Sequence, residues 1–388
     1  MKRSTQIVLW VIWLALLAWG ITGVWRRFTE GHAPANYGSY VPWGLWVAAY
    51  IYFIGLSAGS FLLSCLIYVF GMRKLERVGR LALFTAALTL PMALICIWFD
   101  LGQMWRSYEV FTRAHWTSMM TWMVWLYSGY FVLILVELYV DMRPRRPDID
   151  IERWEYRKRR TLRILGSIGV PLALAFHGGV GALFATLGAK PLWHSGLFPI
   201  LFLTGALVSG GALILAIVSL MGNFGEEKRI EITRILSRIV LALLLFDLLL
   251  EWAELSIPMW YRVGPEYEAL YDLLFGQYWW VFWVFHILLG SVIPAILLIS
   301  RPTSRGAMIA AGGLIAVTFM AVRLNIVIPG QVLAPALQGL ADAYQDPRLV
   351  FSYMPSLYEW SVVSFVAAGG IGAMYIGKRL LPLTQPSS

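Results

Sequence analysis

Cysteine is scarce in this sequence. Its 388 residues include only two, Cys65 and Cys96, and both lie inside apolar runs. An ordinary iron–sulfur cluster needs four protein ligands, and a zinc ribbon needs a similar set. We therefore expect no iron–sulfur cluster and no metal site in this chain, so any electrons that it handles must come from a partner.

Charge is the second scarcity. Charged residues make up 14% of the chain against 59% hydrophobic residues, and the mean hydropathy is +0.68. This composition excludes an ordinary soluble protein and is typical of a chain dissolved mainly in lipid. The net charge of +9 does not indicate nucleic acid, because the basic residues sort to one side of the predicted membrane.

Long apolar runs are abundant, and each has roughly the 20 residues needed to cross a bilayer. The sequence therefore predicts an all-α integral membrane protein with ten transmembrane helices in a single polytopic domain. The N-terminal run lacks a clear small-x-small cleavage site, so we expect it to stay as an uncleaved first helix. The ten predicted helices lie at about 6–25, 43–71, 80–100, 118–141, 161–187, 196–221, 233–257, 278–300, 306–329 and 358–377.

The basic residues predict the orientation. Of the 31 Lys and Arg residues, 23 fall in segments on one side of the predicted membrane and seven on the other. By the positive-inside rule, the richer side and both termini are cytoplasmic. The densest basic segment, 143–160, separates a first four-helix bundle at 43–187 from a second at 196–329. The helices at 6–25 and 358–381 are then additions at the two ends.

One predicted helix carries a histidine followed by glycines. His177 precedes Gly178, Gly179 and Gly181, and such small residues let a neighbouring helix or a flat ligand come close. At 1.5 Å per residue, His177 lies about 15 Å below the outer end of its helix, and His286 lies about 12 Å below the outer end of another. The two histidines therefore share a depth.

Charged side chains gather in the same outer half of the membrane. Intramembrane charges are rare and costly, so several at one depth predict a shared polar cavity. Two purely structural interpretations remain open. In one, Arg323 forms an ion pair with an acid of another helix; in the other, His286 is a buried packing residue without a function. Besides the two histidines, the candidate members of this cavity are Asp100, Asp247, Glu251, Glu254 and Arg323.

Several functions fit such a cluster. Two histidines at one depth permit a haem, which makes a b-type haem anchor one alternative. A quinone site needs an aromatic groove, a polar partner for each carbonyl and a carboxylate or imidazole for the protons, and the outer cluster contains those parts. A proton or ion translocator would need a polar path through the inner half, where Glu137 and Asp141 are candidates unless they pair with Arg143. A pure anchor for electron-transfer subunits is a further alternative.

Several separate motifs are familiar. They are Tyr40-Val-Pro-Trp-Gly-Leu-Trp, Asp100-Leu-Gly-Gln, His177 with Gly181, Ala253-Glu-Leu, Arg323-Leu-Asn and Tyr353-Met-Pro-Ser-Leu-Tyr-Glu-Trp. Together they resemble the NrfD/PsrC family, the membrane subunits of polysulfide-reductase-like complexes. The likeness runs from about Val41 to Pro382 and is greatest to the ten-helix branch that contains HybB and DsrP.

The resemblance implies a respiratory complex subunit of the prokaryotic inner membrane that is not catalytic alone. It implies an exchangeable menaquinone or ubiquinone bound near the outer face, no haem, and electron exchange with a ferredoxin-like iron–sulfur subunit docked on the periplasmic side. Further subunits of the complex and membrane lipid are the other expected partners.

The resemblance also implies roles for particular positions. We expect the quinone in the first bundle, with its head group hydrogen-bonded by His177 and its protons handled by His177 with Asp100 or Glu254. Gly59 and Trp193 are expected to shape the pocket. Three more residues are assigned to the site, Arg323 by the resemblance and Asp247 and Glu251 by the charge cluster alone. The family's Asp-Leu-Gly-Arg is Asp-Leu-Gly-Gln here, which leaves Arg106 as a substitute for the missing arginine.

Overall fold

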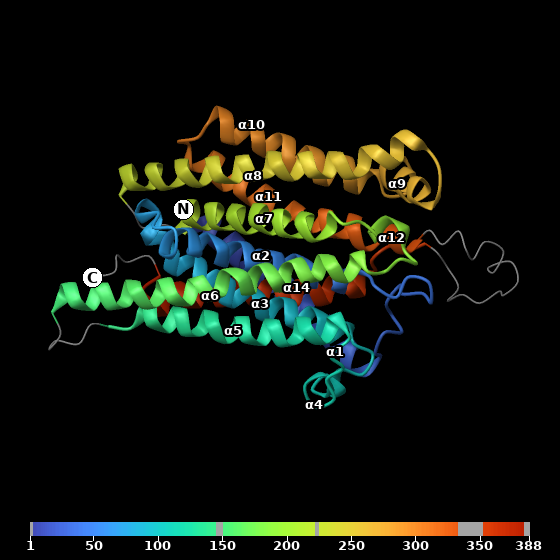
Figure 1. Cartoon of the computed structure of the whole chain (residues 1–388), viewed down its shortest axis with the longest axis horizontal. Coiled ribbons are helices and arrows are strands. Elements are labelled where there is room, and N and C mark those ends of the chain that lie inside the picture. The colour runs from blue at the N-terminus through green and yellow to red at the C-terminus, as the bar shows by residue number, and fades with distance from the viewer. Residues whose placement is uncertain (1–2, 145–149, 222–224, 333–351, 384–388) are drawn as a thin grey trace, which may run out of the picture.

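The chain folds into a bundle of long helices that run side by side (Figure 1). The computed structural model describes residues 3–144, 150–221, 225–332 and 352–383, and within these ranges it contains helices and no strand. The all-α prediction is therefore confirmed for the described chain.

Ten long rods make up the bundle. They are α1 (Arg3–Thr29), α2 (Leu45–Tyr68), α3 (Glu76–Asp100), α5 (Met119–Met142), α6 (Ile151–Ala185), α7 (Phe198–Met221), α8 (Glu226–Tyr261), η4 (Val281–Val292) continuing into α10 (Ile293–Ser300), α11 (Arg305–Val327) and α14 (Leu357–Leu380). The short connecting helices are η1 (Arg73–Leu75), η2 (Met104–Arg106), α4 (Glu109–Thr112), η3 (Pro191–Trp193), α9 (Pro265–Phe275) and α12 (Pro329–Val332).

Nine of these rods, within the described ranges, are long and apolar enough to cross a membrane. The remaining predicted crossing, 233–257, falls in α8, which runs beside the others but carries several charged residues (Figure 1). α1 begins and α14 ends at the same end of the bundle (Figure 1). The exact count of ten and the cytoplasmic placement of both termini stay predictions.

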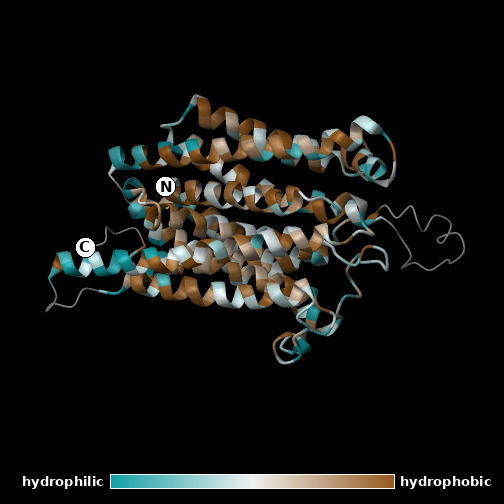
Figure 2. Cartoon of the chain, viewed as in Figure 1, coloured by the Kyte–Doolittle hydropathy of each residue, from teal (hydrophilic) through white to brown (hydrophobic). Residues whose placement is uncertain are grey.

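Two helices extend beyond their predicted apolar runs. α6 begins at Ile151 rather than near residue 161, and the carboxylate of Asp150 caps it by accepting a hydrogen bond from the backbone N–H of Arg153 (3.3 Å). α8 begins at Glu226 rather than near residue 233. Both extensions are hydrophilic and lie at one end of the bundle (Figure 2). The helices therefore continue past the point where hydrophobicity ends.

α2 is the central helix. It packs against α3, α6, α7, α11 and α14, and nearly all of its residues are buried. A Cβ atom at Gly59 would overlap the carbonyl oxygen of Ala206 on α7, and one at Gly210 would lie 2.6 Å from the Gly59 backbone. Gly59, which was expected to shape a ligand pocket, is therefore the point where two helices touch.

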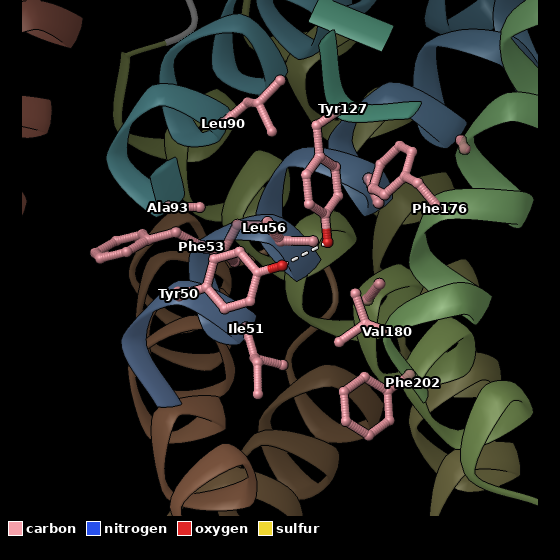
Figure 3. Packing of buried hydrophobic residues seen from close by; sticks show 14 of the residues in the cluster. Tyr50, Ile51, Phe53, Leu56, Leu90, Ala93, Tyr127, Phe176, Val180 and Phe202 are labelled. Atoms are coloured by element: carbon pink, nitrogen blue, oxygen red, sulfur yellow. Dashed lines mark hydrogen bonds between the residues drawn. The ribbon is translucent and has the colours of Figure 1, made fainter. Parts of the chain in front are cut away.

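The region between α2, α5 and α6 is filled by side chains (Figure 3). The hydroxyl groups of Tyr50 and Tyr127 hydrogen-bond each other at 2.6 Å (Figure 3). Phe176 packs its ring against that of Tyr127, at 5.3 Å between centroids. This part of the first predicted bundle is a closed core.

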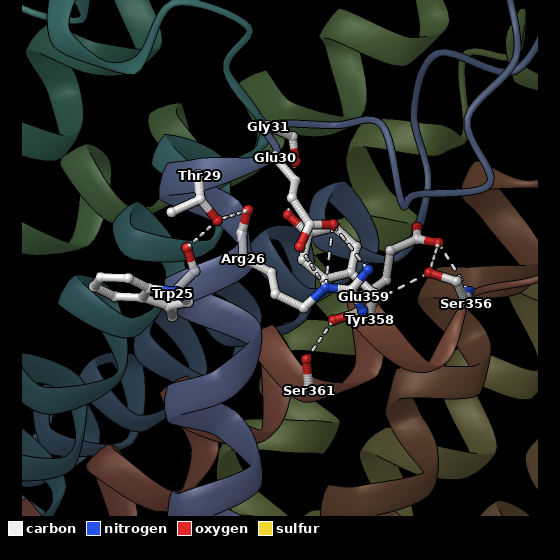
Figure 4. Close-up of polar contacts among 9 residues, drawn as sticks. All are labelled: Trp25, Arg26, Thr29, Glu30, Gly31, Ser356, Tyr358, Glu359 and Ser361. Atoms are coloured by element: carbon white, nitrogen blue, oxygen red, sulfur yellow. Dashed lines mark hydrogen bonds and ion pairs between the residues drawn. The ribbon is translucent and has the colours of Figure 1, made fainter.

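α1 and α14 pair along the edge of the bundle. The indole N–H of Trp13 donates to the carbonyl oxygen of Ala368 at 2.8 Å. At the N-terminus of α14, Ser356 and Glu359 form a reciprocal capping box (Figure 4). Arg26 pairs with Glu30 at 2.9 Å beside it (Figure 4).

Candidate functional site

A cavity of about 310 Å³ lies among α7, α8, α9, η4 and α11. This volume is at the lower end of the range of small-molecule sites, about 300–1,000 Å³. Half of the residues that line it are leucine, isoleucine or phenylalanine. The structure thus brings five of the predicted outer-half residues to one cavity, together with one acid from α9. The charged or ionisable side chains that line it are His194, Asp247, Glu251, Glu254, Glu266, His286 and Arg323, of which His194 and Glu266 are exposed.

The acids of α8 occupy one face of that helix. Asp247, Glu251 and Glu254 are four and three residues apart, which places them on successive turns. Thr204 of α7 donates a hydrogen bond to the carboxylate of Asp247. Glu254 hydrogen-bonds the side chain of Ser195, which lies in the segment before α7. The α8 face is therefore the polar side of the cavity.

His286 forms an ion pair in the cavity wall. Its Nε2 lies 3.1 Å from the Oε2 atom of Glu251. The histidine belongs to η4, a π-helical segment, where the hydroxyl of Ser291 donates to its backbone carbonyl at 3.0 Å. π-Helical turns occur frequently at functional sites. His286 thus directly contacts a carboxylate of α8 in the cavity wall.

Arg323 is the unusual member of this cavity. Its side chain is 1% exposed, and its guanidinium carbon lies 4.9 Å and 5.4 Å from the ring centroids of Phe202 and Phe319. None of its three side-chain nitrogens finds a hydrogen-bond acceptor in the described chain. The predicted pairing with an acid of α8 is not made, because no carboxylate of the described residues comes within 4 Å.

A second donor near Arg323 is also unmet. The side-chain nitrogen of Asn325 is buried and has no partner among the described residues. A guanidinium stays protonated, and leaving buried donors without acceptors is costly. Two such donors on one cavity wall indicate a place for a ligand with acceptor oxygens. The sequence placed Asn325 in the motif Arg323-Leu-Asn but not in the predicted site, although an amide two residues after an intramembrane arginine was a usable signal.

His177 lies behind the cavity wall rather than in it. Its side chain is fully buried, and Nε2 donates to the carbonyl oxygen of Phe202 at 2.7 Å. The ring of Phe202 in turn lies under the guanidinium of Arg323. Gly181, about one helical turn after the histidine, admits α7, since a Cβ there would lie 2.6 Å from the carbonyl oxygen of Phe198. His177 does not line the cavity, but it lies near Arg323, since a Cβ at Gly55 would be 3.7 Å from Cε1 of His177 and 3.6 Å from a terminal nitrogen of Arg323.

Trp193 supports the wall from outside. Its indole N–H donates to the carbonyl oxygen of Ile326 at 2.7 Å, and its ring stacks on Trp43 at 5.6 Å. Its neighbours Leu192 and His194 line the cavity. The residue expected to shape the pocket therefore acts one layer away.

Asp100 belongs to a separate network at the outer end of the bundle. The hydroxyl of Tyr37 donates to its carboxylate at 2.9 Å, and burial raises the pKa of the Tyr37 phenol, which keeps that proton in place. The ring of Tyr37 packs beside Tyr353, whose hydroxyl donates to Glu359. The structure does not bring Asp100 to the cavity that holds Arg323.

Arg106 does not replace the arginine missing from the motif after Asp100. Its side chain is 60% exposed and pairs with Glu109 at 2.7 Å. An exposed pair three residues apart stabilises a helix end but leaves no guanidinium for the buried acid.

The two inner acids also differ from expectation. Asp141 pairs with Arg80 and Lys158, each at 2.9 Å, and not with Arg143. Two cations reach Asp141 because α3 and α6 flank the end of α5, whereas Arg143 follows that helix and is exposed. Glu137 is 1% exposed, and its Oε1 atom has no partner in the described chain.

The two histidines do not form an open pair. Each Nε2 atom has its own protein partner, the Phe202 carbonyl for His177 and Glu251 for His286. The described residues contain no group of three or more His, Cys, Asp or Glu side chains placed to hold a metal ion. The Nδ1 atom of each histidine is buried without a partner among the described residues, and the Nε2 atom of His286 faces a carboxylate with which it can exchange a proton.

Comparison with known proteins identifies the family. Residues 34–335 match the family described as polysulphide reductase, NrfD. The chain belongs to the NrfD family. With its many apolar helices, this NrfD family member is a multi-pass protein of the prokaryotic inner membrane. The recognition made from the motifs is therefore confirmed at the level of the family.

Three relatives of this NrfD family member cover most of its length. A selenate reductase subunit of Mesobacillus selenatarsenatis is 35% identical over 88% of this chain and 86% of that protein. The Hdr-like menaquinol oxidoreductase integral membrane subunit of Archaeoglobus fulgidus is 31% identical over 88% and 85%. The menaquinone reductase integral membrane subunit of Nitratidesulfovibrio vulgaris is 22% identical over 96% and 91%.

Proposed function

We propose that this chain is the quinone-reactive membrane subunit of a respiratory oxidoreductase complex and that it binds the quinone head group beside Arg323. The observation that carries the proposal is the buried guanidinium without an acceptor in a largely apolar cavity. Two relatives named for menaquinol or menaquinone chemistry support the ligand class. Menaquinone or ubiquinone is the exchangeable substrate.

Arg323 supplies the hydrogen bond to one carbonyl of the head group. Its flat guanidinium lies over the faces of Phe202 and Phe319, and a stacked guanidinium keeps its N–H groups free in its own plane. A charge-assisted bond from these donors to a carbonyl oxygen removes the cost of the unmet donors. The amide of Asn325 offers a second donor on the same wall.

The pair formed by Glu251 and His286 handles the protons. Quinone reduction takes up two protons with two electrons, and quinol oxidation releases them, so a carboxylate and an imidazole at 3.1 Å suit the transfer. Glu254 lies about one turn further along α8, and Glu266 of α9 lines the cavity as well. These two acids lead from the pair toward the outer end of the bundle.

The hydrophobic tail has a route to the lipid. Asn325 and Ile328 of the α11 end belong to the wall of a smaller cavity of about 110 Å³, and Asn325 lines the main cavity too. Trp280 and Trp360 line the smaller cavity, and both are partly exposed at the surface of the bundle. We place the tail of the quinone between the start of η4 and α14.

The roles of the two residues first expected at the head group change. His177 is a positioning residue, because it holds the Phe202 carbonyl and thereby the ring beneath Arg323. Asp100 ties the outer ends of α3 and of the loop before α2 together through Tyr37. The electrons come from a ferredoxin-like iron–sulfur subunit docked on the periplasmic face, since the two cysteines of this chain are separate and buried.

Binding of a fluorescent quinone analogue to the purified full-length chain tests this proposal. Arg323→Met removes the donors while keeping an unbranched side chain, and it should weaken binding by about 10–100-fold, the worth of a hydrogen bond to a charged group. Asp100→Asn is the matched control at the other polar network and should change the affinity less than threefold. Thermal unfolding of each variant shows that it is folded.

The opposite result has a defined meaning. Weaker binding in Asp100→Asn with unchanged binding in Arg323→Met would place the head group in the first bundle. If the folded protein binds no analogue, either alone or in its complex, the remaining function is that of a pure anchor for the electron-transfer subunits. A haem absorption band that disappears in His286→Ala would support the b-type haem anchor instead.

A further inference from the structure

A second cavity of about 310 Å³ lies at the end of the bundle where α6 and α8 extend beyond their apolar runs. It is formed by η1, the first turn of α3, α6 and the first turns of α8. This end of the bundle is hydrophilic (Figure 2). The side chains that line the cavity are Arg73, Lys74, Glu76, Arg77, Arg159, Lys228, Glu231 and Ile232.

Both acids of this cavity are already paired. Lys74 lies 3.3 Å from Glu231, which joins η1 to α8. Arg159 lies 3.1 Å from Glu76, which joins α6 to α3. These two ion pairs fix the four elements around the cavity and leave no free carboxylate in its wall.

Three cations remain without an acidic partner. Arg73, Arg77 and Lys228 come from three separate elements and line the same cavity, yet none has an ion pair within the described residues. At the other end of the bundle, Arg26 and Arg106 each pair with a glutamate, and two cations without an ion pair in the described chain, Lys190 and Arg262, do not share a cavity. A surplus of three positive charges around one hollow favours an anion there.

The surroundings select a lipid anion. Ile232, 2% exposed, closes the cavity on its apolar side, and the membrane-crossing stretch of α3 begins within the same segment at Arg73. Phe70, 68% exposed, lies three residues before Arg73. Phosphates of lipids occupy this level, where a hydrophilic end gives way to apolar helix surface.

We propose that Arg73, Arg77 and Lys228 form a binding site for the phosphate group of an anionic phospholipid. The guanidinium groups and the ammonium group contact the phosphodiester, and the acyl chains lie along the apolar surfaces of α3 and α8. A lipid with two phosphodiesters matches three cations better than a lipid with one. This site is separate from the quinone cavity and does not depend on it.

Native mass spectrometry of the delipidated full-length chain, titrated with phosphatidylglycerol, diphosphatidylglycerol or phosphatidylcholine, tests the site. We expect both anionic lipids to bind, diphosphatidylglycerol more tightly, and phosphatidylcholine to bind far more weakly. The triple variant Arg73→Gln, Arg77→Gln and Lys228→Gln should lose on the order of 100-fold in affinity, about fivefold for each basic side chain.

A control variant with the same loss of charge is available at the same end of the bundle, in the first turns of α6. Arg153, Arg157 and Arg160 are exposed and do not line the cavity, so their replacement by glutamine should change the affinity less than threefold. An equal loss in both triple variants would show diffuse attraction and overturn the site. The exposed Lys228→Gln alone keeps the test valid if the triple variant fails to fold, and it should lose about fivefold.

Inorganic phosphate distinguishes the two sources of the anion. If the site recognises a lipid, millimolar phosphate leaves the bound phosphatidylglycerol in place. Displacement of the lipid by phosphate at comparable concentration would show a site for free phosphate and overturn the lipid assignment. Equal binding of phosphatidylcholine would overturn the role of the three cations.

Discussion

The region around His177 and the cavity beside Arg323 adjoin each other, yet they differ in whether unmet polar atoms face open space. Around His177, the imidazole Nε2 and the hydroxyls of Tyr50 and Tyr127 have partners, the imidazole Nδ1 has none among the described residues, and side chains fill the space. Beside Arg323, several donors have none, and the space is open. An unmet hydrogen bond next to a cavity, rather than a polar residue by itself, marks the ligand site.

The largest effect should come from the closed region. Gly59→Val would press a branched side chain into the α7 backbone at Ala206, so we expect a loss of stability of at least about 3 kcal/mol and little folded protein. Gly178→Ala is the control, because nothing lies within 4 Å of its added Cβ. Thermal unfolding in detergent measures both. A stable Gly59→Val protein would show that this contact is loose.

The next effect should arise in the open region. Glu251→Gln removes the proton acceptor opposite His286, and we expect quinone-linked turnover of the assembled complex to fall about 100-fold. Glu137→Gln changes a buried glutamate of α5, which does not line the cavity, and should leave turnover within twofold. The reverse order would favour a proton path through the inner half, with Glu137 and Asp141 as its members.

Replacing His177 tests the boundary between the two regions. His177→Leu removes the hydrogen bond to the Phe202 carbonyl, so we expect a stability loss of about 1–3 kcal/mol and less than a tenfold loss of quinone-analogue affinity. His177→Gln, which retains a donor, should recover most of the affinity. Complete loss of binding in both folded variants would return the head group to the imidazole.

The smallest effect concerns His32, which lies in the segment after α1. The Nε2 atom of His32 is buried without a partner in the described chain, and burial, aided by Arg27, lowers the pKa of this histidine. As the pH falls below about 6.5, the unfolded chain gains the proton first, so stability should decrease. His32→Phe should flatten the pH dependence of thermal unfolding between pH 7 and 5.5. An unchanged slope would assign it to other groups.

Much of the fold follows from hydrophobic length. The predicted runs coincide with the observed rods because each rod must span the same hydrocarbon thickness. The starts of α6 and α8 were misplaced because charged residues continue a helix in water, where hydrophobicity carries no signal. The π-helical turns of η4 leave no pattern in composition, since they depend on packing against α11.

The depth of the site residues in the membrane was predictable from the sequence. Counting residues from a helix end gives the depth of a side chain, and depth grouped Asp247, Glu251 and Arg323 with His286, which line one cavity in the structure. Depth says nothing about the direction in which a helix faces. His177 and Asp100 share the outer half but point to other neighbours, which only the packing of α6 on α7 and of α3 on the outer loop decides.

The pairing of α1 with α14 has a consequence for biogenesis. The two helices contact each other across 355 residues of sequence, through the bond from Trp13 to Ala368, and α1 packs mainly on α14. α1 is made long before α14. While the helices between them are synthesised, α1 must therefore stay in the bilayer beside lipid or insertion factors, and the pair forms only after α14 has been made.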